Sequence, residues 1–574
     1  MYSFRELQKG KKLSLDSTEH KLAVLGNCAT QFFSEAIEGY AKLSDFNLAV
    51  FDADYNQIDE QLLFPASDVY AFDAENILLW LTTERMYEEF LDTVFEEREN
   101  FANDVMGKLS HYWELISKHS NARIIQMNFT ELDDKALGSY SCIVQNTFTF
   151  QLRKLNYLLQ DAASDNRSVY IVDALSVQNR LGTKAFFDDK LYYNAKMTVA
   201  MPALPYLAKA VVDVLKAITG KVKKCVIFDL DNTLWGGVIG DDGLAGIEIG
   251  ELGKGHVFTN LQRWLKELKE YGIILAVCSK NDEAIAKEPF EKHEEMVLKL
   301  ADISLFVANW EDKASNIRMI QESLNIGPDS IVFLDDNPFE RNLVKEKLPD
   351  IEVPELPEDP AQWLVFLQEQ NLFEVASYAR ESGNRTKQYQ QEFERRKSEA
   401  GYDSIDEYLK SLEMVGMSKS FEPLRFPRIA QLTQRSNQFN LRTVRYTEDE
   451  IQRIAQDERY MTLYFTLQDK FGDHGLVSVV IMEKISKDSL FIDNWVMSCR
   501  VLKRGMEEFV MNAVVRNAVK AGYKFIEAEY IPTAKNAMVK GLYQTLGFER
   551  VEEGRLRIKA QDYNVKATFI REGI

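Results

Sequence analysis

Two aspartates, Asp229 and Asp231, have the types and spacing most suggestive of chemistry, because they follow the apolar run 225–228 directly. Open α/β sheets place reactive groups at the carboxyl ends of such strands. Two carboxylates at alternate positions can divide the work: Asp229 would attack a phosphoryl group or hold Mg²⁺, and Asp231 would move the proton. A strand end with solvated acids is the alternative explanation for either residue alone.

Three further apolar runs end in polar residues that complement this pair. A hydroxyl beside backbone N–H groups suits a phosphate oxygen, an ammonium neutralises phosphate charge, and paired carboxylates suit Mg²⁺. The residues at these three run ends are, in order, Ser279 with Lys280 and Asn281, then Lys313, then Asp335 with Asp336.

These side chains require a parallel sheet that brings the run ends to one edge. Amphipathic helical stretches at 258–270 and 313–324 separate the runs, and a strand–helix–strand repeat predicts a doubly wound sheet.

This four-part order resembles the haloacid dehalogenase (HAD) superfamily of phosphoryl-transfer enzymes. The resemblance implies that Asp229 is the nucleophile, Asp231 the general acid/base and Lys313 the charge-neutralising lysine. It also implies that Mg²⁺ is shared by Asp229, by Asp335 or Asp336, and by the backbone carbonyl of Asp231. Within this HAD-like part, the resemblance implies substrate binding by Thr233, Ser279, Lys280, Asn281 and Lys313.

Bulk composition limits the function classes. A chain of 574 residues predicts roughly three or four domains. With 45% hydrophobic and 28% charged residues it is globular. The net charge of −20 disfavours nucleic-acid binding, which needs a concentrated basic surface.

The cysteines and the apolar runs predict a cytoplasmic protein that does not span a membrane. The five cysteines are scattered and contain no Cys-x-x-Cys pair, so zinc knuckles and a disulfide framework are not expected. No signal-peptide core is present at the N-terminus and no apolar run is long enough to cross a bilayer.

Composition shifts divide the chain into three predicted parts, which together form an α/β multidomain protein. Residues 1–219 form a first α/β domain, 220–375 the HAD-like domain without a large cap, and 376–574 a helical connector followed by an α+β domain. The segment 236–250 is too short for a separate cap and is expected to form a flap.

The α+β part contains a basic turn that runs from a strand into a helix, at 492–505. Cations at a helix N-terminus form a cradle for a diphosphate or a phosphopantetheine. This turn and the Tyr543 to Phe548 segment resemble the GNAT acyltransferase fold, which implies that Arg500, Arg504 and Gly505 bind substrate. Lys503 stands where that family has its first loop glycine, which departs from ordinary acetyl-CoA binding.

Several motifs together narrow the resemblance to the FkbH-like family, which fuses a HAD domain to a GNAT-like domain. The motifs lie at 229–237, 277–282, 309–313, 333–338, 437–440, 471–475 and 498–502. The resemblance, which covers residues from about 221 onward, implies a polyketide-pathway enzyme. Such an enzyme takes the glyceryl group of 1,3-bisphosphoglycerate, a phosphorylated three-carbon metabolite, releases phosphate, and passes glyceryl to the phosphopantetheine thiol of an acyl carrier protein.

Acyl capture needs a thiolate, and Cys499 and Cys278 are the main candidates. Cys499 is favoured because Arg500 and a helix N-terminus both lower a thiol pKa. Cys278 precedes Ser279 but faces the core if the strand alternates. His474 is the candidate for proton transfer, and a loop histidine without a chemical role is the alternative.

The N-terminal part resembles SGNH hydrolases weakly. Gly26-Asn27-Cys28 follows the first strand where those enzymes carry Gly-Asp-Ser, and Asn128 matches their oxyanion asparagine. The late Asp-x-x-His block is missing, so a module that docks a carrier protein is favoured over a hydrolase.

Two other functions compete with glyceryl transfer. One is a stand-alone HAD phosphatase that acts on small molecules, and the other is a non-enzymatic scaffold that binds carrier proteins.

Overall fold

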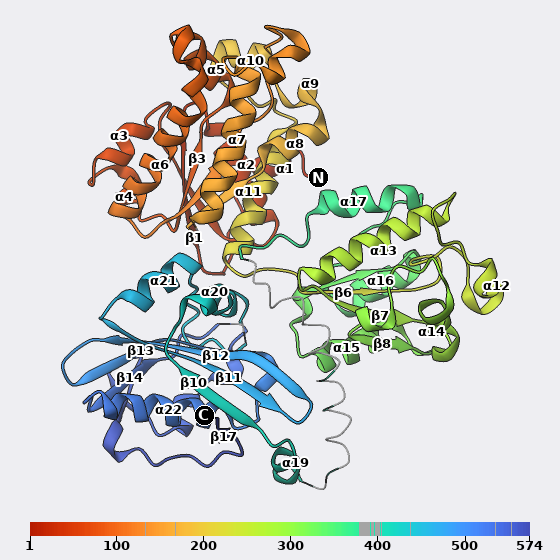
Figure 1. Ribbon diagram of the computed structural model, residues 1–574, viewed down its shortest axis with the longest axis vertical. Coiled ribbons are helices and arrows are strands. Elements are labelled where there is room, and N and C mark those ends of the chain that lie inside the picture. The colour runs from red at the N-terminus through yellow and green to blue at the C-terminus, as the bar shows by residue number, and fades with distance from the viewer. Residues whose placement is uncertain are drawn as a thin grey trace. The chain divides into compact units, whose positions relative to one another are not determined.

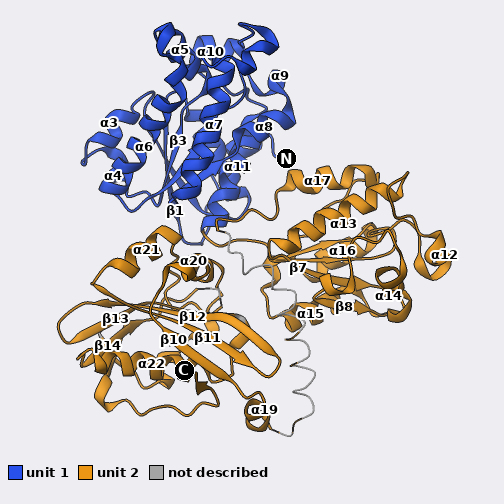
Figure 2. Cartoon of the chain, viewed as in Figure 1, with its two compact units in different colours: residues 1–218 blue, residues 219–574 orange. Residues whose placement is uncertain are grey.

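The computed structural model describes residues 1–573 except for 133, 167, 378–390, 392–394, 396–401, 403, 437, 534 and 553, and it leaves the side chains of Cys499 and Glu552 undescribed. The chain divides into two compact units, Met1–Ile218 and Thr219–Ile574 (Figure 2). The expected connector at 376–400 falls almost wholly outside the described residues.

Unit 1 is an α/β domain built on a parallel sheet. Within its described residues the strand order is β2-β1-β3-β4-β5. The strands are β1 His20–Gly26, β2 Leu48–Asp52, β3 Asn76–Trp80, β4 Arg123–Met127 and β5 Val169–Val172. The apolar runs at 21–25, 47–51, 77–81, 123–127 and 169–172 of the sequence overlap these five strands.

Helices surround this sheet (Figure 1). They are α1 Phe4–Gly10, α2 Gln31–Leu43, α3 Ile58–Leu63, α4 Asp68–Ala71, α5 Thr83–Asp92, α6 Phe101–His119, α7 Phe148–Asp165, α8 Ala174–Leu181, α9 Thr183–Phe186, α10 Asp189–Ala195 and α11 Leu204–Ile218. Alternate strand residues such as Ala23 and Leu25 share a cluster with α6 and α7, and the intervening Leu22 and Val24 are buried as well. Both faces of the sheet are therefore covered, which is the rule for parallel sheets.

The first half of unit 2 contains a second parallel sheet, in the order β8-β7-β6-β9 among the described strands. Its strands are β6 Cys225–Phe228, β7 Ile274–Ser279, β8 Leu305–Ala308 and β9 Ile331–Leu334. The accompanying helices are α12 Ile239–Gly246, α13 Gly255–Glu270, α14 Glu283–Lys292, α15 Lys313–Leu324, α16 Pro338–Lys347 and α17 Trp363–Gln370.

Alternate residues of the strands again face opposite sides of the sheet, so this second sheet has a hydrophobic core on each face. Val226 and Phe228 pack with residues of α13, α14 and α17, whereas Cys225 and Ile227 pack with residues of α15 and α16. The doubly wound arrangement is confirmed. Between β6 and α13 the chain forms α12, a parallel bridge between Asp231 and Trp235 and an antiparallel bridge between Gly236 and Glu248, in agreement with a flap rather than a cap domain.

The second half of unit 2 is an α+β fold around a mixed sheet, whose described strands run β15-β16-β14-β13-β12-β11-β10-β17. They are β10 Val415–Lys419, β11 Tyr460–Asp469, β12 Gly472–Lys484, β13 Ser489–Met497, β14 Phe525–Glu529, β15 Glu549–Glu552, β16 Arg555–Lys559 and β17 Arg571–Glu572. The helices are α19 Ile405–Ser411, α20 Phe426–Arg435, α21 Glu448–Gln456, α22 Met506–Lys520 and α23 Leu542–Thr545. Residues of α22 and α23 pack in one cluster and those of α20 and α21 in another.

The neighbouring strands β13 and β14 pair only over Ser489–Phe491 and Phe525–Glu527. Beyond that point the chain itself fills the gap with residues 439–442. Met497 N–H donates to Phe439 O at 3.2 Å, and Ile531 N–H donates to Leu441 O at 2.9 Å. Backbone groups that would otherwise lose their partners are thereby satisfied.

Among the described residues, no helix has the length and apolar character needed to cross a membrane.

Candidate active site

The carboxyl edge of the β6–β9 sheet gathers the residues expected to react. Asp229 follows β6, Ser279 ends β7, and Asp335 follows β9, while Lys313 is the first residue of α15 after β8. Parallel strands in register bring these ends together. All four residues are buried.

Three carboxylates form a set that can hold a divalent cation. One oxygen from each of Asp229, Asp335 and Asp336 lies within 4.8 Å of the others. Within the described part of the chain, Oδ1 of Asp229 is buried and makes no hydrogen bond. A buried carboxylate oxygen without a partner is costly unless a ligand completes it. Hard oxygen ligands of this kind fit Mg²⁺.

Lys313 balances the charge of this carboxylate set. Its Nζ lies 2.7 Å from Oδ2 of Asp229 and also donates to Oδ2 of Asp335. Burial opposes the charge on Lys313, but the two carboxylates outweigh burial and raise its pKa. Burial and the nearby Asp229 raise the pKa of Asp335. The lysine therefore stays protonated beside Asp229 and Asp335.

Both carboxylate oxygens of Asp231 accept hydrogen bonds that fix its side chain. Oδ1 accepts from Trp235 Nε1 at 3.0 Å and from the N–H of Ile239 at 2.9 Å, and Oδ2 accepts from Asn281 Nδ2 at 3.0 Å. Burial is the main cause that raises the pKa of Asp231, and the Asp229 charge adds to it. A raised pKa suits a general acid. The bond to Ile239 also ties the flap helix α12 to this carboxylate.

Two of the residues expected to bind substrate have other partners here. Thr233 Oγ1 donates to Asp336 Oδ1 at 3.2 Å and accepts from the Asp336 N–H at 3.0 Å, so Thr233 positions a metal-site residue. Lys280 Nζ lies 2.6 Å from Oε1 of Glu340, which directs this ammonium to a carboxylate of α16.

Arg341 is a positioning residue that the sequence did not reveal. The Nη1 atom of this buried side chain donates to the carbonyls of Asp335 at 2.8 Å and Asp336 at 2.7 Å. An arginine on the helix after the second acidic pair fixes the loop that carries both carboxylates. A buried arginine at α16 could not be distinguished from an exposed one before the fold was known.

Cys278 is poorly suited to carry an acyl group in this conformation. Cys278 lies on the β7 face that packs with α15 and is fully buried. Its Sγ contacts Lys313 O at 3.8 Å, and burial raises its pKa strongly. A buried neutral thiol is neither reachable nor nucleophilic.

The α+β part assembles a buried charged cluster around Asp469, which the sequence did not single out. Arg395 donates to both of its carboxylate oxygens, at 2.7 and 2.8 Å, and His474 Nε2 lies 3.0 Å from Oδ2. Arg504 Nη1 lies 3.6 Å from the same oxygen, and Arg500 Nη2 is 3.5 Å from His474 O. His474, Arg500 and Arg504 thus lie close together.

His474 fits a structural role better than proton transfer. Burial lowers the pKa of His474 to about 4. The charges of Arg395 and Arg504 lower it further, and the hydrogen bond to Asp469 raises it only in part. A histidine with this pKa is neutral at pH 7 and a weak base. The alternative of a histidine without a chemical role is favoured, with His474 helping to fix Asp469.

The structure describes Gly505 of the expected cradle in full, but it describes only the backbone of the thiol candidate Cys499. Gly505 precedes α22 with φ of +77°, and a Cβ there would lie 2.8 Å from Thr568 Oγ1. The glycine is therefore required by the turn into α22. The side chain of Cys499 lies outside the described residues, so its role stays a prediction.

The residues that suggested a hydrolase in unit 1 have structural roles. Cys28 is buried, and burial raises the pKa of its thiol far above the usual range. Asn128 donates to Asp173 at 2.7 Å and accepts from the N–H of Leu175 at 3.1 Å, so both ends of its amide are in use. Neither residue is available for catalysis in this conformation.

Comparison with known proteins places the chain in a family. The family model described as the FkbH N-terminal domain matches residues 21–216. A solved structure of the N-terminal part of the protein BF1531 from Bacteroides fragilis, containing a phosphatase domain complexed with Mg, is 44% identical. The match covers 66% of this chain and 100% of that chain, with a TM-score of 0.63. The chain belongs to the FkbH-like family.

The match of the FkbH-like family model extends the resemblance to unit 1, where only a weak SGNH-like pattern was expected. The SGNH-like assignment itself is not confirmed.

Acetyltransferases of known structure match a smaller share of the chain. The ribosomal-protein-S18-alanine N-acetyltransferase of Escherichia coli is 18% identical over 25% of this chain and 94% of its own, with a TM-score of 0.21. Ard1 of Thermoplasma volcanium is 14% identical over 25% and 97%, also with a TM-score of 0.21. No curated protein matches the chain.

Proposed function

We propose that this protein is an FkbH-like, Mg²⁺-dependent phosphatase whose reaction is coupled to transfer of a glyceryl unit onto an acyl carrier protein. The phosphatase half rests on one observation above all: the buried, unpartnered Oδ1 of Asp229 beside Lys313, Asp335 and Asp336. The 44% identical relative contains a phosphatase domain and was solved with Mg.

The chain's own residues suffice to describe the hydrolytic step. A carboxylate oxygen of Asp229 attacks phosphorus, the bond to the leaving oxygen breaks, and Asp231 gives its proton to that oxygen. Water then attacks the aspartyl phosphate, Asp231 takes back a proton, and inorganic phosphate leaves. Lys313 and the region around Ser279 face the phosphoryl oxygens, so charge neutralisation carries much of the rate.

Mg²⁺ would be held by Asp229, Asp335 and Asp336, whose oxygens fit it. When bound, it neutralises phosphoryl charge and orients the transferring group.

The transfer half takes 1,3-bisphosphoglycerate as donor. A thiolate attacks the acyl carbon, the bond from that carbon to the phosphate oxygen breaks, and inorganic phosphate leaves with the electron pair. The remaining phosphate monoester is then hydrolysed at Asp229. The final acceptor is the phosphopantetheine thiol of the carrier protein, and Cys499 is the candidate for an intermediate thiol on the enzyme.

Incubation of the full chain with Mg²⁺, 1,3-bisphosphoglycerate and a holo-carrier protein tests this proposal by intact mass. We expect the carrier to gain one glyceryl unit without phosphate. Carrier-independent phosphate release with no mass gain would leave a stand-alone phosphatase. No phosphate release at all would favour a carrier-binding scaffold.

A further inference from the structure

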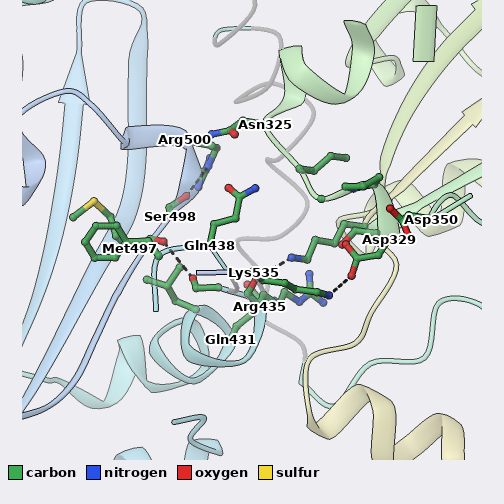
Figure 3. A pocket seen from close by; sticks show the side chains of 18 of the residues that line it. Asn325, Asp329, Asp350, Gln431, Arg435, Gln438, Met497, Ser498, Arg500 and Lys535 are labelled. Atoms are coloured by element: carbon green, nitrogen blue, oxygen red, sulfur yellow. Dashed lines mark hydrogen bonds and ion pairs between the residues drawn. The ribbon is translucent and has the colours of Figure 1, made fainter. Parts of the chain in front are cut away.

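Unit 2 contains a cavity that has no part in the site at Asp229. Its volume is about 510 Å³, within the range of small-molecule sites. It lies between the loop that precedes β9 and the region of α20 and the end of β13 (Figure 3).

The cavity lies at the opposite edge of the β6–β9 sheet from the phosphatase residues. Lys224 and Ser330, which line it, precede β6 and β9, whereas Asp229 and Asp335 follow these strands. The four residues of β6 separate Lys224 from Asp229, a span of about 16 Å at the usual rise per residue. The cavity is therefore a second site and not an extension of the first.

Its charge is opposite to that of the chain. Among the described residues that line it, five side chains are cationic and two, Asp329 and Asp350, are acidic, in a protein of net charge −20. The cationic residues are Lys224, Arg428, Arg435, Arg500 and Lys535. Lys535 pairs with Asp329, and this lysine and the neighbouring ones lower the pKa of Asp329 although burial raises it. A cavity with this excess of cations attracts an anion, and guanidinium groups favour phosphate.

The remaining lining is apolar or uncharged, so the anion is expected to carry an uncharged chain. Apolar side chains come from Ile326, Pro328, Leu432, Phe439 and Met497. A fully ionic ligand such as free phosphate would leave this surface unused.

One wall of the cavity belongs to the turn that carries Cys499. Ser498 and Arg500 both line it, and Arg500 Nε donates to Ser498 Oγ at 3.3 Å. Phe439 forms another part of the wall, and it belongs to the segment that fills the gap between β13 and β14. Residues 439–442 thus occupy the gap between β13 and β14 that a chain-like ligand would need, and the cavity beside the Ser498–Arg500 turn is the alternative place for it.

We propose that this cavity binds an organic phosphate with an uncharged arm, of the phosphopantetheine type, with its phosphate at Arg428, Arg435 and Lys535 and its arm directed to the Ser498–Arg500 turn. The identification of the arm as pantetheine rests on the proposed transfer to a phosphopantetheine thiol. The preference of the cavity for an anion with an uncharged chain follows from its lining residues alone and does not depend on that proposed function.

Calorimetric titration of the full chain with 4′-phosphopantetheine, pantetheine and inorganic phosphate tests the proposal. We expect 4′-phosphopantetheine to bind at least tenfold more tightly than either fragment. Arg428→Gln and Lys535→Gln should each weaken it severalfold, and Lys540→Gln, an exposed lysine of the same segment outside the cavity, should not. Unchanged melting temperatures will show that the variants fold.

Two further titrations identify the source of the arm. Tighter binding of coenzyme A assigns the cavity to a free coenzyme, and displacement of 4′-phosphopantetheine by a holo-carrier assigns it to the carrier. Equal binding of pantetheine and 4′-phosphopantetheine, or unaltered binding in both cavity variants, would overturn the proposal. Phosphate release by the unmodified protein, measured with p-nitrophenyl phosphate, tests the Asp229 site separately.

Discussion

Lys313 and Asp229 form a buried ion pair, with Nζ 2.7 Å from Oδ2, that joins the first residue of α15 to the end of β6. The same ammonium contacts Asp335, so one cation serves two of the three carboxylates that can hold a metal. In the absence of a metal ion, the charge of Lys313 offsets the energetic cost of burying these carboxylates together.

Replacement of Lys313 by Gln should therefore affect both stability and catalysis. Without Mg²⁺ the variant should lose roughly 3–5 kcal/mol, the usual cost of breaking a buried pair, and phosphate release should fall by about 10²–10³-fold. Mg²⁺ should raise the melting temperature of the variant more than that of the unmodified protein. Lys287→Gln, which removes a surface pair with Glu283, is the matched control and should change little. Equal Mg²⁺ effects in both proteins would contradict the assignment.

Asp231→Asn should reveal the role of Asp231 through the leaving group. Loss of a general acid costs about 10²–10⁴-fold for a poor leaving group. An aryl phosphate leaves without help, so its first step should be much less affected, and the aspartyl phosphate should accumulate on Asp229. Rates with alkyl and aryl substrates, together with intact-mass detection of the phosphorylated protein, provide the measurement. A uniform loss for both substrates would argue against proton donation.

Arg341→Gln should weaken Mg²⁺ binding although Arg341 is no ligand. Its guanidinium fixes the carbonyls of Asp335 and Asp336, and loss of an outer partner typically costs about 10–100-fold in metal affinity. A titration of phosphate release against Mg²⁺ should show a higher half-saturating concentration with a nearly restored rate at saturation. A purely structural role would lower the rate at every Mg²⁺ concentration.

His474 should make the α+β part less stable in mild acid. Its pKa is about 4 in the folded protein against an ordinary 6.5, so between these values only the unfolded chain binds the proton. Stability is complete above pH 6.5 and falls by up to about 3 kcal/mol toward pH 4. The lowered pKa of Asp469 adds a loss only at still lower pH.

Hydrogen exchange of β11 and β12 amides, corrected for intrinsic rates, measures this effect in the relevant part of the chain. The stability of the unmodified protein relative to His474→Gln should fall as the pH drops from 6.5 to 4, because only the unmodified protein contains the titrating imidazole. A difference that stays constant across this range would show that His474 is protonated in the folded state.

The sequence predicted the parallel sheets and the catalytic acids because both are local patterns. A buried strand is a short apolar run, and Asp229, Asp231, Asp335 and Asp336 lie within three residues of such runs. Parallel pairing then brings the run ends together without further information. Lys313 was found for the same reason, since it opens the helix after β8.

The partners that tune these acids could not be predicted, because they come from distant positions and depend on rotamers. Lys280 pairs with Glu340, and Arg341 donates to the backbone carbonyl of Asp336. His474 and two arginines contact Asp469. The terminal strands β10 and β15–β17 were also missed, since their residues are short and polar runs that form strands only beside the rest of the sheet.

Phosphate release in the presence and absence of Mg²⁺, by the unmodified protein and by Asp229→Asn, tests the central claim most directly. The account predicts release that chelation abolishes and that added Mg²⁺ restores, with a loss of at least about 10³-fold in the variant. Release that continues in Asp229→Asn, or that is indifferent to Mg²⁺, would contradict the assignment of this carboxylate cluster as a phosphatase site.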